Sequence, residues 1–175
     1  PTEAALQQWR KDCMDIPRQM KAQACQHKTA RGAEDGLFVI LRSAPTSLAP
    51  DWREAVDNFC HESNILTIDW DSDHDHLIKD FDQAVSDKVG QSRAEAYTND
   101  RKAAVAAVDH DETLDDIDEL LAVPPPLDTV IFIKGYLKAG KQLSTVHVGA
   151  VLEKPAKNGS FIETVVQGLP GRCCG

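Results

Sequence analysis

The chain has 175 residues and a formal net charge of -9, with 42% hydrophobic and 27% charged residues. No stretch approaches the roughly eighteen consecutive apolar residues of a membrane-spanning helix, and the first ten residues lack the basic-then-apolar pattern of a secretory signal. Because phosphate neutralisation supplies most of the affinity of nucleic-acid binders, this charge argues against a domain that binds DNA or RNA on its own. It does not exclude one lobe of a larger machine with a local basic edge.

The cysteines indicate the redox setting. An odd number of cysteines without a C-x-x-C pair suits neither a disulfide framework nor a zinc site. They are Cys13, Cys25, Cys60, Cys173 and Cys174. Adjacent residues such as Cys173 and Cys174 rarely bond to each other, because a disulfide holds its Cα atoms about 5.5 Å apart and strain is costly. We therefore expect a reducing, intracellular and cytoplasmic setting.

The first 36 residues are expected to form a helical lead-in and a linker. The helix should cover residues 2–28, with Pro17 breaking or restarting it, and residues 32–36 should form the linker. An apolar stripe marks this helix: Leu6, Trp9, Cys13 and Ile16. Residues 37–41 are an unbroken apolar run, which is typical of a strand buried on both faces.

Helices and strands then alternate along the chain. The apolar residues from Trp52 to Cys60 have the spacing of a surface helix. Further helices are predicted at residues 78–89, 90–110, 114–121 and 160–167, and further strands at residues 65–68, 129–134 and 145–152. This alternation predicts one α/β domain, a mostly parallel sheet flanked by helices, with an N-terminal helical segment.

Residues 135–141 read G-x-x-x-x-G-K after a predicted strand, which is close to a phosphate-binding loop. In such a loop a Ser or Thr follows the Lys and binds Mg²⁺, whereas Gln142 stands there in this chain. The residues from Thr145 to Val151 are mostly β-branched and favour a strand where that loop needs a helix. We therefore do not assign a phosphate-binding loop to this segment.

A more complete account takes residues 128–175 together. They are expected to form a strand, a glycine-bearing turn, a second strand and a short helix that leads to Gln167-Gly168-Leu169-Pro170-Gly171-Arg172. This order resembles the second RecA-like lobe of superfamily 2 helicases of the phage or viral type. In that lobe one strand leads into motif V with its glycine, and a later helix ends in motif VI, a Gln or His followed by Gly-Arg. The resemblance covers residues 37–43 and 128–175, with Leu37–Ser43 as the first strand and the motif IV loop.

The resemblance implies roles for particular residues. Gly140 would be the motif V glycine, and Gly140, Gln167 and Gly171 would face bound ATP. Arg172 would be the arginine finger, because a planar guanidinium suits the charge that develops on the γ-phosphate. Contacts with nucleic acid would come from strand ends and the loops after them. The candidates are Arg42, Ser43, Lys134 and Lys138.

The chain departs from motif VI at two places. The spacing from Gln167 to Gly171-Arg172 is one residue longer than usual, and Gly175 stands where a second arginine is expected. Which arginine acts as the finger is therefore left open.

On this interpretation residues 37–175 are one lobe of an ATP-dependent helicase or translocase. ATP hydrolysis with Mg²⁺ would need the N-terminal RecA-like lobe of the same parent protein, so this fragment would not be active alone. DNA is expected as the partner in preference to RNA, without a membrane and without a structural metal. For a viral protein the setting would be the host cell.

A second group of polar residues is Asp69-Trp70-Asp71-Ser72-Asp73-His74-Asp75-His76, just past the predicted strand 65–68. It is similar to a calcium loop, but the sixth position is His74 instead of Gly and the twelfth is Asp80 instead of Glu. The simpler interpretation is an acidic helix start, where carboxylates cap free N–H groups and favour the helix dipole. Two alternatives to the helicase lobe stay open: a non-catalytic acidic protein-interaction domain, and a small metal-dependent hydrolase that uses residues 69–76.

Overall fold

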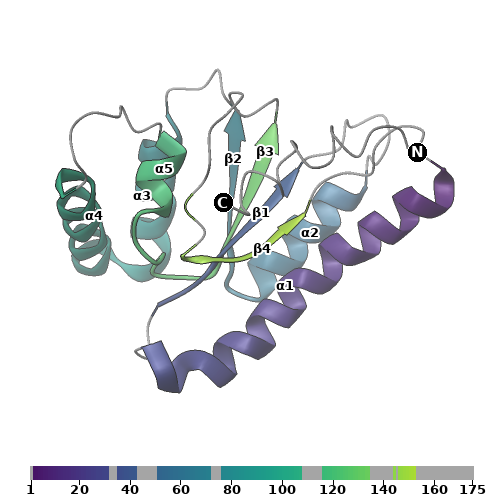
Figure 1. The fold of residues 1–175 in the computed structure, drawn as a ribbon, viewed down its shortest axis with the longest axis horizontal. Coiled ribbons are helices and arrows are strands. Elements are labelled where there is room, and N and C mark those ends of the chain that lie inside the picture. Colours follow the sequence, from purple (N-terminus) through teal and green to yellow (C-terminus); the bar gives the residue numbers. More distant parts are fainter. Residues whose placement is uncertain are drawn as a thin grey trace.

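A four-stranded, all-parallel sheet forms the centre of the computed structural model (Figure 1). The structure describes residues 2–31, 35–42, 51–71, 76–107, 116–134, 144 and 146–152, with only the backbone for residues 16, 17, 20–31, 71 and 134. The strands are β1 (Phe38–Arg42), β2 (Leu66–Asp71), β3 (Thr129–Lys134) and β4 (Val148–Leu152), in the order β2-β3-β1-β4. The predicted α/β class with a parallel sheet is therefore confirmed.

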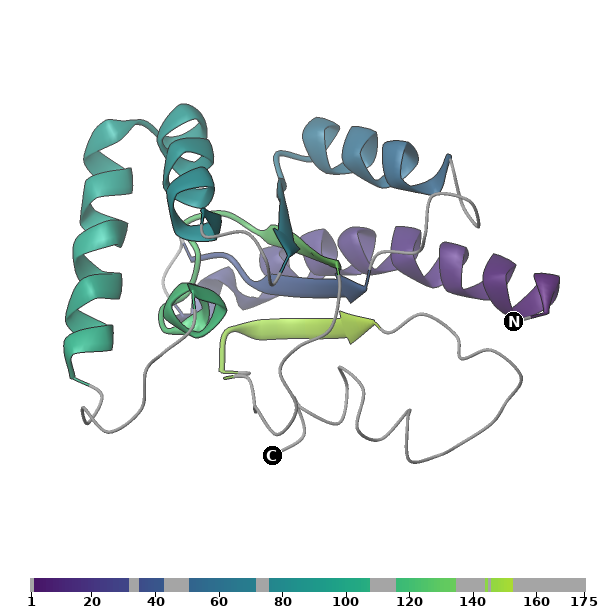
Figure 2. The same cartoon turned by 90° about the horizontal axis from the view of Figure 1, so that it is seen from above.

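Helices cover both faces of this sheet. Helices α1 (Glu3–Arg31) and α2 (Trp52–Glu62) pack on one face. Helices α3 (Leu77–Val89), α4 (Gln91–Ala106) and α5 (Asp116–Leu121) pack on the other. Figure 2 shows α3, α4 and α5 grouped together, away from α1 and α2. The two helical layers bury both faces of the central strands.

The side chains of β1 alternate between these two layers. Phe38 and Ile40 belong to the apolar cluster with α3, α4 and α5, while Val39 and Leu41 belong to the cluster with α1 and α2. All four are 0% exposed. Because both faces of the strand are buried, its first four residues are a continuous apolar run, and the charged Arg42 comes only at its end.

The residues just before β1 and β3 lie close together at the edge of the sheet where the parallel strands begin. The Gly36 N–H donates to the Pro125 carbonyl oxygen at 2.7 Å, and the Leu37 N–H donates to Asp128 Oδ1 at 3.0 Å. A Cβ on residue 36 would lie 2.2 Å from the carbonyl carbon of Leu127. Only glycine allows the two backbone segments to approach this closely.

Helix α1 differs from the expectation at Pro17. It is continuous from Glu3 to Arg31, so the predicted break is wrong. A proline removes one hydrogen bond of a helix, and good helix formers on both sides keep the rest of this 29-residue helix together. The predicted stripe of Leu6, Trp9 and Cys13 is buried. The Ile16 side chain and the predicted helix at residues 160–167 lie outside the described residues.

Candidate functional site

The carboxyl ends of the parallel strands meet at one edge of the sheet. Arg42 at the end of β1 lies opposite Ile133 of β3, and Lys134 at the end of β3 lies opposite Asp71 of β2. The structure therefore places two of the predicted contact residues, Arg42 and Lys134, at the same edge on neighbouring strands. Ligands of open parallel sheets bind outside this edge.

Arg42 is buried, which does not favour a direct contact between its side chain and a ligand. It is 7% exposed, and its side chain has a partner within the protein. For Lys134 the backbone position alone is described. The remaining predicted site residues lie outside the described residues: Ser43, Lys138, Gly140, Gln167, Gly171 and Arg172.

Chain connectivity relates these remaining residues to the same edge. Ser43 directly follows β1, the segment with Gly140 follows β3, and the segment with Gln167 and Arg172 follows β4. Strand β1 lies between β3 and β4 in the sheet. All three segments therefore leave from adjacent strands at the carboxyl edge.

The first part of the acidic group at residues 69–76 is strand and not loop. Strand β2 runs to Asp71, because its pairing with β3 continues through Asp71 and Lys134. Trp70 is 6% exposed and packs in the cluster with α3. The prediction that this group begins past the strand is therefore wrong, because Asp69, Trp70 and Asp71 belong to β2.

Helix α3 begins at Leu77, and the side chain of its N-cap residue His76 makes no capping hydrogen bond. Among the described residues no group of three or more His, Cys, Asp or Glu side chains is placed to hold a metal ion. Residues 72–75 lie outside them. The metal hypothesis therefore receives no support from Asp69 or His76.

Asp69 instead pairs with an arginine that the sequence prediction did not include. Arg53, in the first turn of α2, donates from Nη1 to Asp69 Oδ1 at 2.6 Å and from Nη2 to Oδ2 at 3.2 Å. Its Nε donates to Asp57 Oδ2 at 2.8 Å, and its guanidinium carbon lies 3.4 Å from the centroid of the Phe132 ring. Burial lowers the pKa of Arg53, but the hydrogen bonds that it donates to Asp69 and Asp57 outweigh this effect and raise the pKa above its ordinary value. Arg53 therefore stays charged, is paired with two carboxylates, and links α2 to the sheet.

Only part of this cluster has a signal in the sequence. The i,i+4 spacing of Arg53 and Asp57 is typical of a helical ion pair. The pairing with Asp69 depends on the fold, which brings the start of α2 beside β2.

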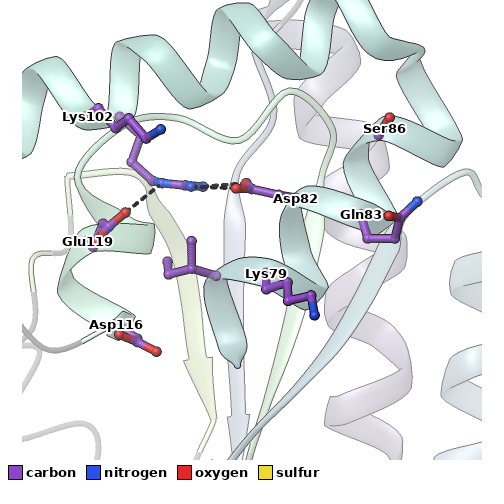
Figure 3. A pocket seen from close by; sticks show the side chains of 9 residues that line it. Lys79, Asp82, Gln83, Ser86, Lys102, Asp116 and Glu119 are labelled. Carbon is purple, nitrogen blue, oxygen red and sulfur yellow. Dashed lines mark hydrogen bonds and ion pairs between the residues drawn. The ribbon is translucent and has the colours of Figure 1, made fainter. Parts of the chain in front are cut away.

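Side chains of helices α3, α4 and α5 line an open polar pocket of about 630 Å³ (Figure 3). Arg101 of α4 lies at its base with a side chain that is 1% exposed. Arg101 donates from Nη1 and Nη2 to the Asp82 carboxylate at 2.7 and 2.8 Å, and from Nε to Glu119 Oε1 at 3.1 Å. Its guanidinium carbon lies 5.3 Å from the Tyr97 ring centroid. One buried cation thus joins three helices.

The cation at the base of this pocket is paired with carboxylates of the protein itself. Burial lowers the pKa of Arg101, and the hydrogen bonds and charge of Asp82 raise it well above its ordinary value. For Tyr97 burial acts in the other direction and raises the pKa to about 12, although the charge of Arg101 lowers it. Arg101 is therefore charged and Tyr97 neutral at any physiological pH, which suits a structural role.

Comparison of the chain with protein-family models, with curated proteins and with solved structures gives no match. In the part of the chain that the structure describes, no helix is both long enough and apolar enough to cross a membrane.

Proposed function

We propose that residues 37–175 are the second RecA-like lobe of an ATP-dependent nucleic-acid helicase or translocase. The observation that best supports this proposal is the all-parallel sheet with the order β2-β3-β1-β4. Its carboxyl edge is where the segments with the candidate residues begin, after β1, β3 and β4. In open parallel sheets this edge is where nucleotides and other ligands bind.

In this proposal the chain contributes one half of an ATP site. Gly140, Gln167 and Gly171 face the nucleotide, and Arg172 donates to the γ-phosphate, where a forked guanidinium stabilises developing charge. Lys134 and Lys138 contact nucleic acid beside it. Arg42 holds the edge from within, since it is 7% exposed. The N-terminal lobe of the parent protein supplies the phosphate-binding loop and the Mg²⁺-binding acid.

The test is nucleic-acid-stimulated ATP hydrolysis by the parent protein with Arg172→Ala and Arg172→Lys. Arginine fingers contribute about 10³–10⁵ in rate in other phosphoryl-transfer enzymes, so the alanine variant should lose at least about tenfold. Such a loss corresponds to about 1.4 kcal/mol. The lysine variant should recover little, because an ammonium keeps the charge but lacks the planar fork.

Lys102→Ala is the matched control, since it removes an exposed cation from α4. It should leave turnover unchanged, and all variants should melt at matching temperatures. An arginine in a surface turn would alter stability by no more than about 0.5 kcal/mol and turnover not at all. Unchanged turnover in both Arg172 variants would remove the chemical basis of the proposal.

A further inference from the structure

We draw no further inference here: the strongest candidate, the open polar pocket lined by α3, α4 and α5, carries nothing, because its buried cation Arg101 is already paired with Asp82 and Glu119 and none of the described residues that line it indicates which ligand or partner would fill it.

Discussion

Replacing Arg101 with Met should strongly destabilise the protein. The change removes a side chain that is 1% exposed and leaves the carboxylates of Asp82 and Glu119 without their cation. Removing one partner of a buried ion pair costs about 3–5 kcal/mol. Asp82 and Glu119 are 31% and 30% exposed and can regain some hydration, so we expect the lower end, about 3 kcal/mol. For a domain of this size that corresponds to a fall in Tm of about 6–12 °C.

Urea unfolding followed by circular dichroism measures this loss, with an unchanged m-value as evidence that the unfolded state is the same. Lys102→Met is the matched control, because it removes the neighbouring, exposed cation of the same helix and should stay within about 0.5 kcal/mol. Adding Asp82→Asn to Arg101→Met should restore part of the stability, since it removes a carboxylate that has lost its partner. An Arg101→Met protein that unfolds at the same urea concentration as the wild type would show that the three-helix link contributes nothing.

Two further predictions concern buried groups. Burial raises the pKa of Cys13 and of Cys60 from an ordinary value of 9.0 to about 12, helped by the charges of Asp12 and Asp57 respectively. The unfolded thiols ionise first, so the stability that these groups contribute is complete below pH 9 and declines as the pH rises toward 12. Both thiols should also resist a thiol reagent at pH 8 until denaturant is added, and rapid labelling in buffer that peptide mass mapping assigns to Cys13 or Cys60 would contradict their burial. Gly36→Ala should cost about 3 kcal/mol or more, because the new methyl group meets backbone instead of a side chain that can move. A urea midpoint equal to that of the wild type would refute the close approach.

The sequence predicts the elements in which apolar residues follow a recognisable pattern, either a continuous run or a stripe. The apolar run of β1 and the stripe of α2 appear in the structure where they are expected, because each pattern reports the faces that the element buries. Helix α4 has no such pattern. Its buried residues are Ala94, Tyr97 and Arg101. Of these, only Tyr97 is a large side chain of a type that is common in protein cores.

Long-range pairing accounts for what the sequence does not predict. Arg101 looks like a solvated charge until the fold supplies Asp82 from α3 and Glu119 from α5. Asp69 looks like a loop ligand until α2 brings Arg53 beside it. Neither pair has a local spacing from which it can be recognised. The predicted nucleotide residues after β3 and β4 follow from the resemblance alone, and they stay predictions.

The order of the strands has a consequence for how the chain is made. Strands β1 and β2 come first in the sequence, yet they are not neighbours, because β3 lies between them. A ribosome-bound chain that ends after α5 holds two apolar strands with no hydrogen-bonded partner for either. At about 5–20 residues per second, the segment from β2 to β3 takes several seconds to synthesise, and during that time both strands are open to wrong pairing. The helices formed in the meantime can shield them, but the sheet itself can assemble only when residues 129–134 have emerged.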